Sequence, residues 1–254
     1  MRASLQCLAL LFALSAVGLL SVAPSSALPS PTCHASTATK TVVGRPTATV
    51  AWRVKPLAQT GFYTSIPRDG ARRLGSVVPS QAAWLLVLSA AKDREGHCWV
   101  KIRLPTRPNR ATGWIDGERM LLRPTSWRIV VSLATRTLTV DHAGTATRRM
   151  RVVVGTPATP TPAGLFSIIG VWRSSPNAFL GSWILALTAH SDVLREFDGG
   201  NGRVGIHGRG GASLLDPLGS ADSHGCVRLA NTAIDWLVRT IGPTQLPGTP
   251  VQID

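Results

Sequence analysis

Apolar and polar side chains alternate along much of this chain, and this period of two is the feature that most restricts its fold. In the second half the apolar positions form three runs, at Trp127, Ile129, Val131 and Leu133, then at Leu138 and Val140, then at Met150, Val152 and Val154. Successive side chains of a strand point to opposite faces, so the alternation predicts half-buried strands. Residues 141–144 have the composition of a hairpin turn. The sequence therefore predicts a β-sheet that starts with two adjacent hairpins.

The residues before this sheet also predict strands, but in a separate small barrel or sandwich. Short apolar runs at 84–88, 98–104 and 114–115 are separated by Gly, Pro and Asn. Several short strands at regular spacing are typical of such folds. Residues 28–40 are rich in Pro, Ser and Thr and have little to bury, which indicates a linker. We expect a linker at 28–40, a β-barrel at 41–124 and a second domain at 125–254.

Helices are expected only in the second domain. The helical spacing i, i+3, i+4 and i+7 is occupied by Ile234, Leu237, Val238 and Ile241. Asn231 stands where an N-cap belongs, and Gly242-Pro243 ends the run. A second, short helix is expected at Thr188–Phe197, over a sheet face. Residues 156–164, rich in Pro and Thr, are expected to form a loop because proline does not fit a central strand.

The first 27 residues predict a secretory signal peptide. A positive start, Met1-Arg2, precedes an apolar run from Leu5 to Ala23, and Ser25-Ser26-Ala27 offers the small residues that a signal peptidase reads. We expect cleavage after Ala27 and export across the cytoplasmic membrane. The alternative is an uncleaved anchor, because about 20 apolar residues span a bilayer.

The net charge of +14 comes mostly from arginine. In a cytosolic protein this balance would first suggest nucleic acid. For an exported protein it favours anionic wall polymers, a membrane surface or a carboxylate-rich substrate, and we expect no nucleic-acid partner. An equally weighted explanation is the coding bias of a GC-rich genome.

Three cysteines remain after the signal, an odd number for an oxidising compartment. Cys7 lies within the signal, whereas Cys33, Cys98 and Cys226 do not. The simplest hypothesis pairs Cys33 with Cys98 and leaves Cys226 free. In the chain-entropy model such a bridge contributes roughly 4 kcal/mol.

Chemistry is concentrated in two short segments, Ile206-His207-Gly208 and Ser223-His224-Gly225-Cys226-Val227-Arg228. Together they hold a thiol, two imidazoles and glycines that let backbone amides approach a carbonyl, which are the groups needed for acyl transfer through a thioester. His207 is distant enough in sequence to reach Cys226 from a neighbouring strand, so we assign it as the general base. His224 is too close to Cys226 to turn onto the thiol easily, and we assign it a supporting part.

The remaining motif residues are assigned to orientation and binding. The Gly208 carbonyl is a candidate to orient the His207 imidazole, a part that a carboxylate often takes. The N–H groups of Gly225 and Cys226 are candidates for an oxyanion hole. We expect Ser223, Gly225 and Arg228 to contact the substrate or the oxyanion. For Arg228 two interpretations stay open, a substrate carboxylate or a surface acid. Asp216 and Asp222 are interpreted as turn residues.

Two further groups of residues in the second domain bear on metal binding and on substrate binding. His207, His224 and Cys226 lack the paired spacing of zinc modules, so we expect no metal there. Trp172 and Trp183 are more typical of a core than of a sugar-binding surface. Both lie beside loops of the catalytic half, and a substrate-facing position stays open for them.

The motif residues also resemble a known family. His207-Gly208 followed by the block from Ser223 to Arg228 is similar to the catalytic motif of the L,D-transpeptidases, the YkuD-like cell-wall enzymes. Val154-Gly155-Thr156 and the stretch 159–166 resemble the segment that follows their first strands. Many members have Asn where this chain has Arg228, which bears on substrate detail. More weakly, residues 99–116 resemble the last strands of bacterial SH3-like domains.

The resemblance implies a fold and a reaction. The fold would be mainly β, an SH3-like small barrel followed by an L,D-transpeptidase-type β-sandwich with short helices. The Cys226 thiolate would attack the third residue of a peptidoglycan tetrapeptide stem, release D-Ala and form a 3→3 cross-link without a cofactor. Carbapenems would be covalent inhibitors. A cysteine hydrolase of wall peptides and a non-catalytic wall-binding protein stay open as alternatives.

Overall fold

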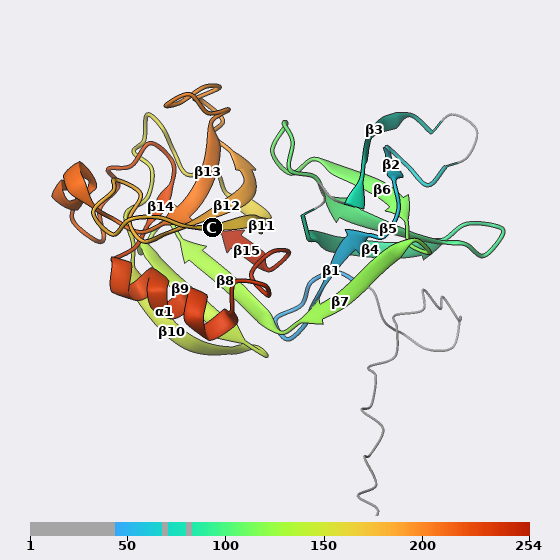
Figure 1. Ribbon diagram of the computed structural model, residues 1–254, viewed down its shortest axis with the longest axis horizontal. Helices are drawn as coiled ribbons and strands as arrows, with labels where there is room; N and C mark the ends of the chain where they lie inside the picture. Colours follow the sequence, from blue (N-terminus) through green and yellow to red (C-terminus); the bar gives the residue numbers. More distant parts are fainter. Residues whose placement is uncertain (1–43, 68–70, 80–82) are drawn as a thin grey trace, which may run out of the picture. The chain divides into compact units, whose positions relative to one another are not determined.

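The computed structural model describes residues 44–67, 71–79 and 83–254 of the 254-residue chain. The expected signal peptide, the linker and Cys33 lie outside these residues. The described part is mainly β, as the sequence predicts, with two sheets and one α-helix (Figure 1). In it, no helix has both the length and the apolar character needed to cross a bilayer.

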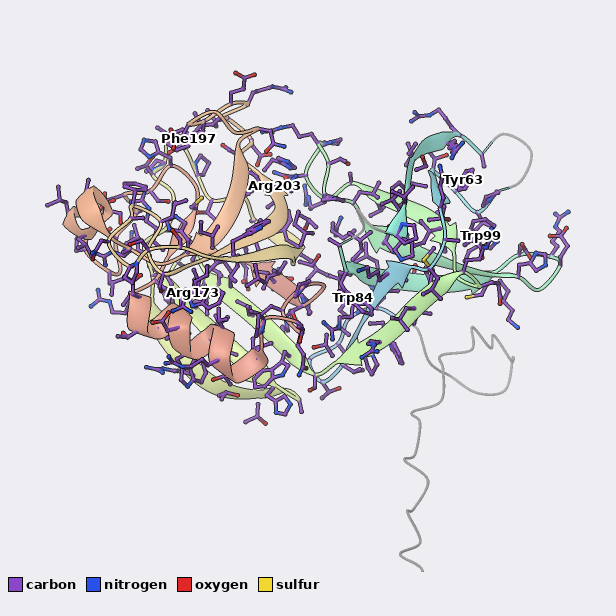
Figure 2. All side chains as sticks on the ribbon, viewed as in Figure 1. Tyr63, Trp84, Trp99, Arg173, Phe197 and Arg203 are labelled. Carbon is purple, nitrogen blue, oxygen red and sulfur yellow. The ribbon has the colours of Figure 1, made fainter. Side chains whose placement is uncertain are left out.

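The first sheet has seven strands. They are β1 (Ala51–Pro56), β2 (Thr60–Tyr63), β3 (Arg73–Val77), β4 (Leu85–Lys92), β5 (Cys98–Arg103), β6 (Thr112–Asp116) and β7 (Met120–Thr125), in the order β3-β2-β6-β5-β4-β1-β7. Val54, Val100 and Ile115 are fully buried between them. Tyr63 and Trp99 meet edge to face, with ring centroids 6.0 Å apart (Figure 2). The β prediction is confirmed here, while the SH3-like resemblance stays a prediction.

Cys98, at the start of β5, is disulfide-bonded. Its partner lies outside the described residues, so the pairing with Cys33 stays a prediction. Within the described part, Cys226 is the free cysteine. The sequence hypothesis also left Cys226 free, and the structure agrees with it on this point.

The second sheet has eight strands and carries the motif residues. They are β8 (Trp127–Ser132), β9 (Thr137–His142), β10 (Thr145–Arg151), β11 (Gly164–Arg173), β12 (Trp183–His190), β13 (Arg203–His207), β14 (Val227–Arg228) and β15 (Pro250–Ile253), in the order β10-β9-β8-β15-β11-β12-β13-β14. The predicted hairpins are present. Ile129 pairs with Val140 and Val131 with Leu138, and all four are fully buried. The alternating pattern therefore placed these strands correctly.

Helix α1 (Asn231–Ile241), the one α-helix among the described residues, buries the apolar face that the sequence predicts. It ends at Gly242, whose N–H donates to the Val238 carbonyl at 2.9 Å. The prediction that Asn231 is the N-cap is wrong, because Ala230 takes that position without a side-chain hydrogen bond. The Asn231 side chain instead forms hydrogen bonds with backbone groups of two neighbouring loops, described below.

The expected helix at Thr188–Phe197 is wrong. Its first three residues, Thr188 to His190, end strand β12. There the Thr188 hydroxyl accepts a hydrogen bond from the Ser167 N–H of β11 at 3.1 Å, so pairing between strands wins over helical propensity. Further on, Phe197 and Gly200 pair as an isolated bridge. A short 3₁₀ helix, η2 (Gly211–Leu215), was not expected from the sequence.

The strand register sorts side chains onto the two faces of the second sheet. One row of directly paired residues runs across β11, β12, β13 and β14 through Val171, Leu185, Ile206 and Val227. This row packs into the core. The adjacent row runs through Trp172, Ile184, His207 and Arg228. Because successive residues of a strand face opposite sides, the second row lies on the other face, where the motif residues gather.

Candidate active site

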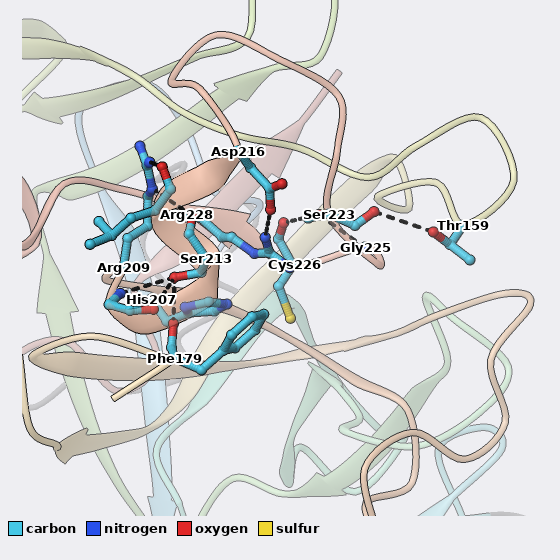
Figure 3. A network of polar contacts seen from close by, with 12 residues as sticks. Thr159, Phe179, His207, Arg209, Ser213, Asp216, Ser223, Gly225, Cys226 and Arg228 are labelled. Carbon is cyan, nitrogen blue, oxygen red and sulfur yellow. Dashed lines mark hydrogen bonds and ion pairs between the residues drawn. The ribbon is translucent and has the colours of Figure 1, made fainter. Parts of the chain in front are cut away.

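Two neighbouring parallel strands bring the two motif segments together. Ile206 pairs with Val227, and His207 pairs with Arg228. His207 and Cys226 then line two adjoining spaces, a small cavity of about 50 Å³ and an open one of about 550 Å³. The structure thus brings the His207 imidazole and the Cys226 thiol together, as the sequence predicts (Figure 3).

His207 is buried and held by a backbone carbonyl. Its Nδ1 lies 2.7 Å from the carbonyl oxygen of Gly208. A carbonyl only accepts, so Nδ1 carries the proton and Nε2 is the basic nitrogen. Burial lowers the pKa of His207 to about 4, against the opposing effect of the Gly208 and Leu180 carbonyls, and the Arg228 charge lowers it further. His207 is therefore a neutral imidazole at physiological pH, the form that accepts a proton.

Cys226 is half-buried, and its sulfur accepts a weak hydrogen bond from the Gly205 N–H at 3.4 Å. Burial raises the pKa of the Cys226 thiol, while the Gly205 N–H and the Arg228 charge lower it. Desolvation disfavours the charged form of both groups, so it keeps the proton on the thiol and disfavours protonation of the imidazole. The resting pair is therefore a neutral thiol beside a neutral imidazole.

Ser223 fixes the turn that presents the cysteine. Its side chain is fully buried, and its hydroxyl donates to the Cys226 carbonyl at 2.6 Å. The same oxygen accepts from the Gly225 N–H at 3.1 Å. Gly225 has a φ of 116°, a backbone conformation that favours glycine. Ser223 and Gly225 therefore shape the turn, and the substrate or oxyanion contact expected of them stays a prediction.

The loop that follows β10 forms hydrogen bonds with the turn at Ser223–Cys226. The Thr161 hydroxyl donates to the Gly225 carbonyl at 2.9 Å and accepts from the Gly155 N–H at 2.8 Å. The Thr159 hydroxyl donates to the Ser223 carbonyl at 3.2 Å (Figure 3). The Thr- and Pro-rich loop therefore meets the catalytic turn through side-chain hydroxyls.

Arg228 is buried beside the thiol and pairs with Asp216. Its guanidinium also lies over the Phe179 ring, 4.9 Å from the centroid (Figure 3). Of the two interpretations of Arg228, the acid partner is present in the structure. Asp216, which was interpreted as a turn residue only, is that partner, and it is partly exposed. Nothing in its local sequence distinguishes it from Asp222.

His224 is exposed, and its ring lies 4.9 Å from that of Phe197, with the planes tilted by 31°. Both rings line the small cavity beside Cys226. His224 thus lies at the rim of the site, and its supporting part stays a prediction. Phe197 was not singled out in the sequence, and its exposure is the structural sign of a rim residue.

Asn231 is the positioning residue that sequence reasoning missed. Its Oδ1 accepts from the N–H groups of Ser182, at 3.1 Å, and Arg209, at 3.0 Å, and its Nδ2 donates to the Pro176 carbonyl at 3.0 Å. A Cβ on Gly208 would come within 2.2 Å of the same Oδ1, so only glycine fits there. Asn231 therefore ties the β11–β12 loop to the segment whose carbonyl orients His207.

One group of metal-binding residue types occurs in the described part of the chain, Asp93, Glu95 and His97 in the β4–β5 hairpin. Asp93 accepts hydrogen bonds from the backbone N–H groups of Glu95 and His97 and from Trp99 Nε1. These bonds account for Asp93 as a turn residue. The group includes none of the motif residues.

Residues 126–253 match the YkuD family, the L,D-transpeptidase catalytic domain. No curated protein matches the chain.

Similar solved structures include three L,D-transpeptidases. A mutant L,D-transpeptidase of Enterococcus faecium has 22% identity over 50% of this chain and 49% of its own, with a TM-score of 0.35. The protein LdtMt1 in complex with imipenem has 19% identity over 80% of this chain and 82% of its own, with a TM-score of 0.40. L,D-transpeptidase 3 from Mycobacterium tuberculosis, in complex with a faropenem-derived adduct, has 15% identity over 68% and 92%, with a TM-score of 0.40. The chain spans about half the length of the E. faecium protein.

Proposed function

Because the chain belongs to the YkuD family of L,D-transpeptidase catalytic domains, we propose that it forms 3→3 cross-links in peptidoglycan through a thioester on Cys226. The donor is a tetrapeptide stem and the leaving group is D-Ala. The observation that carries the proposal is the buried imidazole of His207, with its Nδ1 tied to Gly208, sharing a cavity with the Cys226 thiol. A nucleophile beside an oriented base is the arrangement that acyl transfer needs.

In the first half-reaction Cys226 Sγ attacks the carbonyl carbon of the third stem residue. The thiol proton passes to Nε2 of His207. As the bond between the third residue and D-Ala breaks, the same proton passes to the amine of D-Ala, which leaves. The enzyme then holds the third residue as a thioester, and His207 is neutral again.

In the second half-reaction an amine on the side chain of a neighbouring stem attacks the thioester carbonyl. His207 accepts a proton from the amine and returns it to the sulfur of Cys226 as the carbon–sulfur bond breaks. The products are the 3→3 amide and the free thiol. The two half-reactions need no metal or organic cofactor.

The negative oxygen that develops at the attacked carbonyl requires an N–H donor. Of the two donors expected from the sequence, the Gly225 N–H is already bonded to Ser223 Oγ at 3.1 Å. We therefore assign the oxyanion to the backbone N–H of Cys226 itself. The loss of one such donor typically costs about 10²–10³ in rate.

The test is mass spectrometry of products after the full chain is mixed with a disaccharide–tetrapeptide muropeptide. The expected product is a dimer that has lost one D-Ala, and Cys226→Ala should abolish it. Free tripeptide stem without dimer would instead identify the hydrolase that the sequence left open. Unchanged donor, with Cys226 shown to be reduced, would reject both enzymatic assignments and favour a wall-binding protein.

We extend the proposal to inhibitors and location. A carbapenem should acylate Cys226, seen as an increase in intact mass by one inhibitor molecule that is absent with Cys226→Ala. Export to the cell wall after cleavage at Ala27, and wall binding by the first sheet as an SH3-like domain, complete the proposal. N-terminal sequencing of the mature protein tests the cleavage, and sedimentation with purified sacculi tests wall binding.

A further inference from the structure

Trp172 is a large aromatic side chain that the proposed mechanism does not use. It stands near the end of β11 and is 53% exposed. It pairs with Ile184 of β12, which pairs with His207 of β13. Directly paired residues point to the same face of a sheet, so Trp172 shares the face that carries the general base. Two strand spacings, about 10 Å, separate the backbones of Trp172 and His207.

Beside the row that holds Trp172, Ile184 and His207, a second row of the same sheet face consists of small residues. Gly170 pairs with Ala186, and Ala186 pairs with Gly205, whose N–H bonds to Cys226 Sγ. Ala186 and Gly205 line the open cavity of about 550 Å³, and the exit of β11 reaches the same cavity at Ser174. The open cavity therefore extends from Cys226 to Ser174, which follows the end of β11 two residues beyond Trp172.

The glycine at position 170 also fixes the indole. A Cβ at Gly170 would come within 2.2 Å of Cη2 of Trp172, so the six-membered ring occupies the space that a side chain would fill. The ring thus lies against the strand backbone, while half of the side chain stays open to solvent. Its neighbour Val171 and the paired strand's Trp183 pack against the core instead. Trp183 therefore matches the core interpretation, and Trp172 does not.

We propose that Trp172 binds a sugar ring of the glycan to which the donor stem is attached. The inference rests on the proposed function, which places the carbonyl of stem residue 3 at Cys226. Three extended residues span about 10 Å, so the first stem residue and its sugar reach the strand that carries Trp172. A pyranose ring has an apolar C–H face and polar edges. A half-exposed indole offers a complementary apolar surface without burying the hydroxyl groups.

The experiment measures binding by calorimetry, with Cys226→Ala as the background so that no turnover occurs. The ligands are a disaccharide–tetrapeptide and the same tetrapeptide without sugar. Trp172→Ala should weaken binding of the first roughly five- to tenfold and leave the second unchanged. Trp172→Phe should recover part of the loss. Leu215→Ala, which removes an 83% exposed side chain in η2, serves as the matched control and should change neither.

Three outcomes would overturn the inference. They are equal affinity of the background protein for both ligands, no effect of Trp172→Ala on the disaccharide ligand, and an equal loss for both ligands, which would assign Trp172 to the peptide. Thermal unfolding of each variant checks the fold. Release of D-Ala from the two donors by the wild type is measured separately. If the wild type releases D-Ala from both donors at the same rate, the Trp172 inference is refuted and the proposed function is retained.

Discussion

Replacement of Asn231 by alanine is the most direct test of how the site is held together. The substitution removes three hydrogen bonds, two of them accepted by Oδ1 from the N–H groups of Ser182 and Arg209. Both of those residues are buried. A part-buried hydrogen bond contributes about 1 kcal/mol net, and an N–H left without a partner adds its desolvation cost. We expect the free energy of unfolding to fall by about 2–4 kcal/mol.

The effect on chemistry should be separable from the effect on stability. Without the Asn231 oxygen, the Gly208 carbonyl is no longer fixed, so the proton of His207 is not confined to Nδ1. Nitrogen-15 spectra of the imidazole should show one tautomer in the wild type and a mixture in Asn231→Ala. The rate of Cys226 acylation by a carbapenem should fall at temperatures where the variant is fully folded.

Asn231→Asp is the matched control, because it keeps the Oδ1 acceptor and replaces only the donor to the Pro176 carbonyl, with an oxygen that the carbonyl repels. A carboxylate in the first turn of a helix is also favourable to the helix dipole. It should retain most of the stability and the single tautomer. The reasoning would be refuted if Asn231→Ala unfolds at the wild-type denaturant concentration and keeps the Nδ1–H tautomer of His207.

Three further predictions concern protons and the catalytic turn. Because burial lowers the pKa of His207 from 6.5 to about 4, its contribution to stability is complete above pH 6.5 and is lost as pH falls toward 4. The loss is about 3 kcal/mol, measured by urea unfolding of wild type and His207→Gln across that range. Asp216→Asn leaves the Arg228 charge unpaired beside the thiol and should lower the pKa of Cys226, seen as iodoacetamide alkylation that rises at lower pH; an unchanged profile would contradict this. Thr161→Val removes two hydrogen bonds under the turn and should cost about 1–3 kcal/mol in denaturant unfolding, whereas Thr135→Val, on an exposed turn, should cost little.

The sequence located the strands of the second sheet because their core residues recur every second position. Val131 and Leu138 are paired and buried as the alternation requires. The helix α1 was found because its apolar spacing is equally regular. Both signals are local, since a window of about ten residues contains them. The failed helix at 188–197 shows the limit, because pairing of Thr188 with β11 depends on a partner 21 residues away.

In the active site, too, the sequence predicted what local signals indicate and not the contacts between distant segments. A cysteine after His-Gly, with a second histidine upstream, identified the nucleophile and the base as residue types with a suitable separation. It did not reveal that Asp216 pairs with Arg228, or that the Gly225 N–H is bonded to Ser223. These contacts depend on how a loop folds back on itself, and many aspartates and serines in loops have the same local sequence.

By itself, then, the sequence determined the strands of the second sheet, the helix, the chemical identity of Cys226 and His207 and the family of the catalytic domain. Tertiary structure alone decided the protonation of that pair, because burial sets both pKa values and burial is a property of packing. It also decided that Asn231 holds a loop 49 residues away and that Trp172 faces solvent on the side of the site. Periodicity tells which face of a strand is apolar, but only the register between strands tells which residues meet across it.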